Sequence, residues 1–102
     1  SNTPDREDYD DYSEYLKDCR DWLREDSLDR IDSGQNSVGD LSQSLADLRM
    51  GFNSDVVNVD TEISSFRRDV NNLERLIRML EWRNDKIQEI QEELERLETG
   101  EK

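Results

Sequence analysis

The sequence predicts an all-α protein of extended amphipathic helices that form a coiled coil, and three observations lead to this fold class. The 102-residue chain has one proline, at position 4, and four glycines, so little interrupts helix formation between Arg6 and Leu97. Apolar residues recur at steps of three and four along much of the chain. Hydrophobic residues make up 31% and charged residues 40%, which leaves too few apolar side chains for a compact core within one copy.

The N-terminal third divides into a tail, a helix and a linker. Residues 1–8 are expected to form an acidic tail, and residues 9–31 an acidic amphipathic helix. Residues 32–40, DSGQNSVGD, favour a hinge or linker, because Gly, Ser, Asp and Asn prefer turns to helix interiors. A continuous helix stays open there if packing against a partner overrides propensity. The spacing that predicts the first helix is that of Tyr9, Tyr12, Leu16, Cys19 and Leu23.

Residues 41–98 predict a long coiled-coil helix, followed by a C-terminal tail at 99–102 in which Gly100 suits the position just past a helix end. Two consecutive steps of four, 48 to 52 to 56, form a stutter that contains Gly51 and Asn53, so the helix is expected to be weakest there. The expected oligomerisation seam consists of Leu41, Leu45, Leu48, Phe52, Val56, Val59, Ile63, Phe66, Val70, Leu73, Ile77, Leu80, Asn84, Ile87 and Leu94.

Asn84 falls where this pattern calls for an aliphatic residue. With Val56 at heptad position a, β-branched residues fill a, leucine is common at d, and Asn84 is the one amide at a. That arrangement favours a parallel homodimer, in which two Asn side chains pair across the seam and other alignments bury an unpaired amide. The alternative interpretation is that Asn84 is partly solvated. Phe66 at d and Leu76 beside the seam leave three or four strands open.

The sequence offers little for catalysis or for a cofactor. It has no histidine and one cysteine, so the commonest general base and metal ligand is missing, and neither a thiolate zinc site nor a Cys–His dyad can form. We therefore expect no enzyme activity, no metal site and no cofactor. Cys19 is a candidate for an interchain disulfide if two copies run parallel, with a small buried apolar residue as the alternative. Trp82 lies off the seam and is a candidate partner contact.

The net charge of −13 limits the partners. Nucleic acid is not expected, because binding it requires clustered Lys and Arg, and no apolar run is long enough to insert into a membrane. The cytoplasm of a halophile and an extracellular or virion stalk both fit this composition. In its heptad pattern from about Leu41 to Leu97 and in its acidic, arginine-over-lysine balance, the chain resembles haloarchaeal coiled-coil rods, including accessory proteins of archaeal motility machinery. The resemblance implies a rod and assigns no residue a role.

These observations predict a structural oligomerisation module, a coiled-coil rod that joins and spaces other domains of a larger protein or assembly. The partner expected first is a second copy of the chain, with a dimer favoured over a trimer. One alternative is an adaptor helix, or a helical hairpin that turns at 32–40, which binds a different protein. Another is the trimeric stalk of an extracellular or viral protein.

Overall fold

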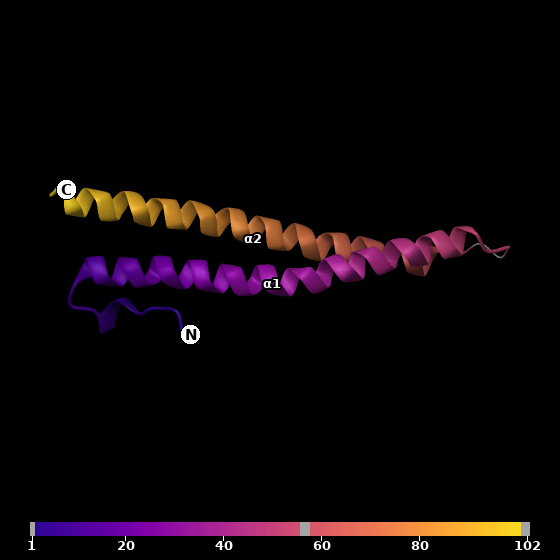
Figure 1. Ribbon diagram of the computed structural model, residues 1–102, viewed down its shortest axis with the longest axis horizontal. Helices are drawn as coiled ribbons and strands as arrows, with labels where there is room; N and C mark the ends of the chain where they lie inside the picture. The colour runs from indigo at the N-terminus through magenta and orange to yellow at the C-terminus, as the bar shows by residue number, and fades with distance from the viewer. Residues whose placement is uncertain (1, 56–57, 101–102) are drawn as a thin grey trace. The chain divides into compact units, whose positions relative to one another are not determined.

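The computed structural model describes residues 2–55 and 58–100, and every regular element in this part of the chain is helical. A 3-10 turn, η1 (Arg6–Asp8), precedes two long α-helices, α1 (Tyr12–Phe52) and α2 (Asp60–Glu98), as Figure 1 shows. The prediction of an all-α fold built from long helices is therefore confirmed. The chain divides into two compact units: unit 1 contains Ser1–Asp29 and Met79–Lys102, and unit 2 contains Arg30–Arg78.

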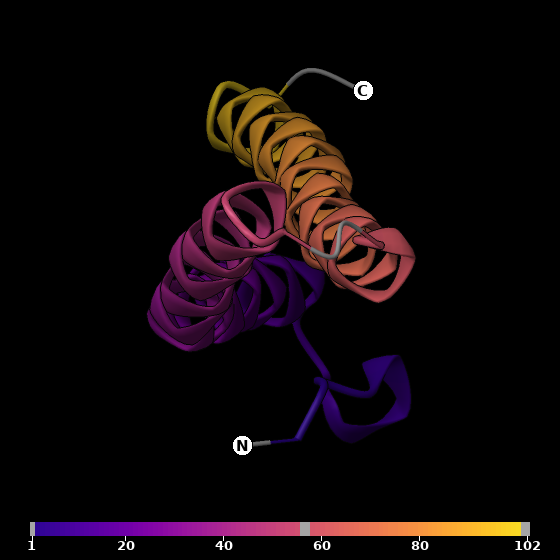
Figure 2. The same cartoon turned by 90° about the vertical axis from the view of Figure 1, so that its right-hand side faces the viewer.

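Unit 2 is an antiparallel helical hairpin, made by the second part of α1 and the first part of α2. Gly34 faces Leu76, the Ser44 hydroxyl donates to the Asp69 carboxylate, and Gly51 faces Val59. As the residue number rises along α1, the number of the facing residue in α2 falls, so the two helices run in opposite directions. Figure 2 shows this hairpin from the end at which the chain turns.

Hydrogen bonds stabilise the end of α1 and the start of α2 on either side of the turn in unit 2. The Asn53 amide donates to the Arg49 carbonyl over 3.1 Å, which extends the hydrogen bonding of α1 by one step. The side-chain oxygen of Asn58 accepts from the Asp60 amide over 3.2 Å and satisfies one of the free donors at the start of α2. Asp60 and Glu62 place negative charge in the first turn of α2, where the helix dipole favours it.

The break between helices therefore lies elsewhere than the sequence suggested. Residues 32–40 remain helical, and the helix expected over 41–98 is interrupted after Phe52 and resumes at Asp60. Packing explains the first difference: Gly34 is buried against Leu76, so a residue that disfavours helix in isolation gives close contact between helices here. The second difference coincides with the stutter, which marks where one helix ends and the other begins.

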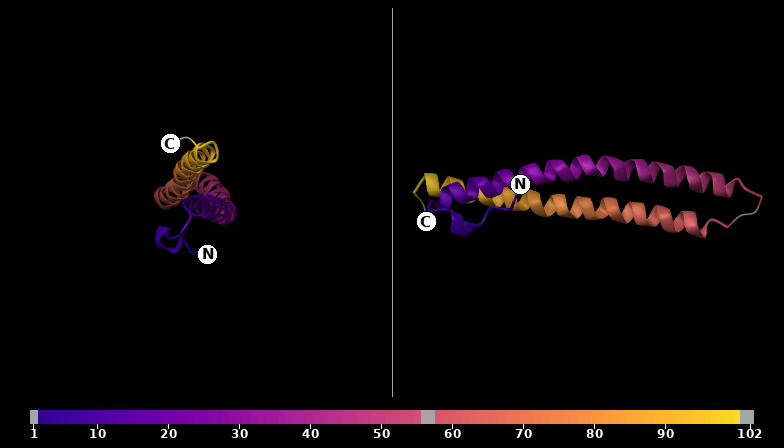
Figure 3. Two further views of the ribbon diagram at one scale, coloured as in Figure 1. Left: turned by 90° about the vertical axis from the view of Figure 1, so that its left-hand side faces the viewer. Right: turned by 90° about the horizontal axis from the view of Figure 1, so that it is seen from below.

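Unit 1 pairs the first part of α1 with the last part of α2, again in opposite directions. Figure 3 shows these two helix segments side by side. Arg20 donates to Gln91 over 3.3 Å, while Arg83 lies against Asp26. α1 begins at Tyr12 and not at Tyr9, because the Asp11 side chain accepts from the Ser13 amide over 3.0 Å and caps the helix. At the same end of the unit, Gly100 follows α2 and has a φ of 76°, the left-handed conformation expected just after a helix.

Few apolar side chains are buried in the described residues. The buried hydrophobic residues are Leu16, Leu23, Val59 and Leu94, each 7% to 9% exposed, and no side chain is fully buried. Many large hydrophobic side chains remain in contact with solvent instead. They are Tyr12, Leu28, Ile31, Val38, Leu45, Met50, Phe52, Ile63, Ile77, Trp82 and Leu97.

Two glycines of α1 test the packing of unit 2. A Cβ at Gly39 would meet no atom within 4 Å, whereas a Cβ at Gly51 would lie 2.5 Å from Cγ1 of Val59, which is buried. Gly39→Ala is therefore expected to raise the free energy of unfolding by about 1 kcal/mol through helix propensity. Gly51→Ala is expected to lower it by about 1–3 kcal/mol through overpacking. Urea unfolding followed by circular dichroism measures both changes, and equal stabilisation by the two variants would contradict the hairpin packing.

Candidate interaction surface

The contact between the helices of unit 2 follows positions three and four residues apart on each helix. On α1 four of the six seam positions carry glycine or serine and two carry leucine, and on α2 the seam includes two carboxylates. All of these residues are buried or half-buried, as expected for the contact line of a helix pair. The seam residues of unit 2 are Gly34, Ser37, Leu41, Ser44, Leu48 and Gly51 on α1, then Val59 directly before α2, and Glu62, Phe66, Asp69, Leu73 and Leu76 on α2.

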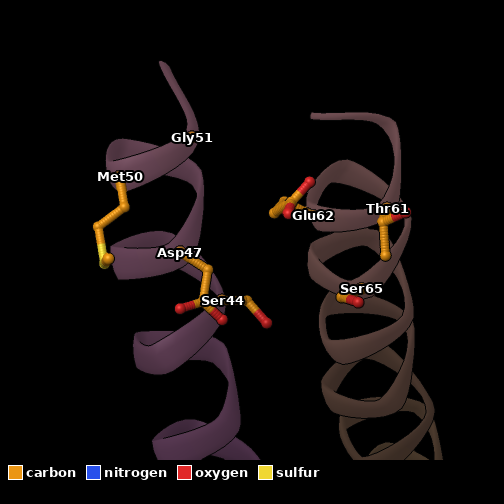
Figure 4. A pocket seen from close by; sticks show the side chains of 7 residues that line it. All are labelled: Ser44, Asp47, Met50, Gly51, Thr61, Glu62 and Ser65. Atoms are coloured by element: carbon orange, nitrogen blue, oxygen red, sulfur yellow. The ribbon is translucent and has the colours of Figure 1, made fainter. Parts of the chain in front are cut away.

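Each helix of unit 2 has one further column of residues on either side of its seam. One pair of columns is polar and consists of Ser33, Asp40 and Asp47 on α1 and Ser65 and Asn72 on α2. An open groove of about 410 Å³ brings Asp47 and Ser65 together on one side of the hairpin. Figure 4 shows that Ser44 and Asp47 reach into this groove from α1, and Glu62 and Ser65 from α2.

The other pair of columns must lie on the opposite side of the hairpin, because each helix has only two sides next to its seam. These columns are apolar at every position, and we call them the apolar face. Five of its side chains are between 43% and 63% exposed, Ile63 is 39% exposed, and Val70 is half-buried. The apolar face consists of Ile31, Val38, Leu45 and Phe52 of α1 and Ile63, Val70 and Ile77 of α2.

The structure divides the predicted oligomerisation seam into an inner and an outer set. The inner set is buried or half-buried in the helix contacts of its own unit: Leu41, Leu48, Val59, Phe66, Leu73, Leu80, Ile87 and Leu94. The outer set consists of Leu45, Phe52, Ile63, Val70, Ile77 and Asn84, of which Val70 is half-buried and the others are exposed. Val56 lies outside the described residues. Whether a second copy covers the outer set stays a prediction.

Sequence reasoning missed the polar half of the seam. Asp69 is 5% exposed and Ser44 is 6% exposed, and the Ser44 hydroxyl donates to the Asp69 carboxylate across the hairpin. The Oε2 atom of Glu62 is also buried, and no hydrogen-bond partner is found for it among the described residues. The available signal was the seven-residue spacing of Glu62, Asp69 and Leu76, which matches the spacing of the apolar seam column three residues before it.

The Ser44–Asp69 contact gives a prediction. Ser44→Ala removes the hydroxyl that donates to a buried carboxylate, so we expect a loss of about 1–3 kcal/mol in the free energy of unfolding. Ser42→Ala, two residues away and exposed, is the matched control and should change stability by less than about 0.5 kcal/mol. Adding Asp69→Leu to Ser44→Ala should recover the loss, because an apolar pair needs no donor. Failure of this recovery in urea unfolding would show that Asp69 depends on other partners.

Arg83 is the buried polar residue of the unit 1 contact. It is 9% exposed, and its Nη1 atom lies 2.5 Å from Oδ2 of Asp26. Its guanidinium carbon lies 5.5 Å from the centre of the Trp22 ring, and Nη1 also donates to the Ser27 hydroxyl over 3.5 Å. The ion pair, the ring contact and the hydrogen bond together position α2 against α1 in unit 1.

Arg83→Met should therefore destabilise the protein by about 1–3 kcal/mol, because the methionine keeps the apolar stem but removes the charge that faces Asp26. Arg78→Met is the control, since Arg78 is exposed. Thermal unfolding of both variants checks the difference. A change in stability of similar size at Arg78 and Arg83 would exclude a specific role for the Asp26 ion pair.

Unit 1 contains an apolar groove with a volume of about 460 Å³. It is lined by both tryptophans, Trp22 and Trp82, and by the half-buried Cys19. Pro4 also lines it and belongs to the N-terminal arm, the residues 2–11 that precede α1. The Tyr9 hydroxyl donates to Asp18 over 2.6 Å, which connects the arm to α1 and raises the pKa of Tyr9 to about 12. A hydrogen bond with Cys19 raises the pKa of Tyr15.

Trp82 is 57% exposed at the edge of this groove, and Lys86 Nζ lies 5.5 Å from the centre of its ring. Its role as a partner contact stays a prediction, as does the interchain disulfide at Cys19. Among the described residues, no group of three or more Cys, Asp or Glu side chains is placed to hold a metal ion. None of the described helices combines the length and apolar character needed to cross a membrane.

Comparisons with known proteins give no relative from which a role could be transferred. No protein-family model matches the chain, and neither a curated protein nor a solved structure shows significant similarity to it. The fold and the surfaces described above therefore define a class only: an acidic all-α protein with long antiparallel helix contacts and one extended apolar face.

Proposed function

We propose that this chain is a structural oligomerisation module that joins copies of itself and thereby spaces other domains of a larger protein or assembly. One observation carries the proposal: the described residues bury only four hydrophobic side chains, while eleven large ones stay exposed. Burial of apolar surface is the main driving force of folding, and small domains with thin cores usually rely on association. A second copy supplies the missing apolar contacts.

The hairpin of unit 2 favours one form of this module over the others expected from the sequence. In a parallel two-stranded coiled coil, Val59, Phe66 and Leu73 would face the same residues of the other copy. In unit 2 these side chains already lie in the contact with α1. We therefore propose that hairpins associate, and that a dimer of hairpins replaces the parallel pair of single helices and the trimeric stalk.

The charge of the chain sets the conditions for association. A net charge of −13 on each copy opposes self-association at low ionic strength. The screening length over which like charges repel is about 30 Å at 0.01 M salt but only about 3 Å at 1 M. Salt also strengthens apolar contacts when its anions are excluded from the protein surface. Both effects favour the oligomer as salt is added.

The mass in solution tests the proposal. Light scattering coupled to size exclusion should give twice the mass of one chain at about 1 M salt, with dissociation on dilution into about 0.01 M salt. The midpoint of thermal unfolding should rise with protein concentration, because association couples to folding. A single-chain mass at high salt and at a protein concentration of about 0.1 mM would refute a role in self-association. A mass of three chains would favour the stalk.

A further inference from the structure

We propose that the apolar face of unit 2 is the surface on which a second copy of this chain docks, so that two hairpins form a four-helix bundle. This inference rests on the proposed function and adds the surface and its occupant. The face belongs entirely to residues 30–78, so it is defined within one compact unit. Nothing among the described residues of that unit covers it.

The residues of the apolar face form regular rungs across the hairpin. Gly34 faces Leu76 and Gly51 faces Val59, which fixes the alignment of α1 on α2. On this alignment Ile31 is nearly level with Ile77, Val38 with Val70, and Leu45 with Ile63. The rungs repeat every seven residues on both helices, or about 10.5 Å at 1.5 Å per residue. A surface with the same repeat on both edges can interdigitate with a rotated copy of itself, as a closed two-fold dimer requires.

The area of the face suits a dimer. From the exposed fractions of its six exposed side chains, the face presents roughly 500–600 Å² of apolar surface, at the upper end of what monomeric proteins expose in one patch. Two such faces bury roughly 1,000–1,200 Å² before any surrounding residue is counted, which reaches the lower end of stable specific interfaces.

The charges around the face also favour a like partner. The positions that border it on the outer side are Gln35, Ser42 and Arg49 of α1 and Asp60, Arg67 and Glu74 of α2, and all are exposed. Two are positive and two are negative, so this border is neutral although the whole chain carries −13. On the other side of the hairpin, the exposed Asp40 and Asp47 would repel their equivalents in a second copy.

The two apolar columns stop together at the end of unit 2 that lies away from the turn. One heptad beyond Ile31 along α1 the residue is Arg24, and one heptad beyond Ile77 along α2 it is Asn84, which is exposed. Because Ile31 is nearly level with Ile77, both polar residues bound the same end of the face. Sliding a second copy past this end by one heptad would set apolar side chains against polar ones, which penalises that shift.

A lysine scan at two exposed apolar positions tests the surface. Leu45→Lys introduces a charge into the centre of the face, and we expect dimerisation to weaken by at least about 100-fold. Met50→Lys is the matched control, because Met50 is 71% exposed and lines the groove on the polar side. Both changes reduce the net negative charge equally and keep a good helix former. A difference in dimerisation between the two variants therefore cannot come from general charge repulsion or from helix propensity.

Sedimentation equilibrium at about 1 M salt gives the dissociation constants, and circular dichroism checks that helix content is retained. Val38→Gln is measured alongside as a milder change and should weaken the dimer at least about tenfold. If both Leu45→Lys and Val38→Gln dimerise as tightly as the unmodified chain, the face is not the interface, although the proposed function stands. If the unmodified chain is monomeric, both proposals fail. If Met50→Lys weakens dimerisation as much as Leu45→Lys does, the interface does not lie on the proposed side of the hairpin.

Discussion

The close contact between α1 and α2 along a seam of small and polar residues is the constraint on which the rest of unit 2 depends. Glycine at position 34 leaves room for Leu76, and glycine at 51 leaves room for Val59. The hydroxyl of Ser44 satisfies the carboxylate of Asp69. Such a seam fixes alignment well, since a shift by one heptad would separate the paired polar groups and set larger side chains against each other. It buries little apolar surface, however, so it cannot be the main source of stability.

Unit 1 shows the same preference for paired polar groups inside a helix contact. Arg83 is buried in the helix contact of this unit, and its charge is matched by Asp26 and by the face of the Trp22 ring. Leu16, Leu23 and Leu94 supply the buried apolar contacts of this unit. An arginine can take such a place because its stem packs against apolar neighbours while its guanidinium group keeps several hydrogen bonds.

The sequence predicted the class of fold because the three-and-four spacing is a property of each helix alone. It also indicated the true break, since the stutter at 48–56 contains Gly51 and Asn53, but the Gly and Ser residues of 32–40 gave a stronger local signal. That signal was misleading because Gly34 is held in helix by contact with Leu76, which sequence alone does not reveal. The polar seam positions were missed for a related reason: Asp69 and Arg83 resemble surface residues until their partners are known.

The candidate surface was predicted in part. Leu45, Phe52, Ile63, Val70 and Ile77 were all assigned to an oligomerisation seam, but that seam mixed two columns which the structure separates. Ile31 and Val38 were not included, because the expected linker at 32–40 interrupted their column. Periodicity locates apolar residues on a helix, whereas the choice of which column faces which neighbour depends on tertiary packing.

The width of the apolar stripe on α2 decides how many neighbours this helix requires. In unit 2 one column, Val59, Phe66 and Leu73, contacts α1, and the adjacent column, Ile63, Val70 and Ile77, belongs to the apolar face. A parallel pair of α2 helices would cover both columns but would leave the column of α1 from Ile31 to Phe52 without a partner. Two associated hairpins cover all of these columns at once. Stripes wider than a two-stranded seam are typical of helices in such bundles, and both helices of unit 2 have one.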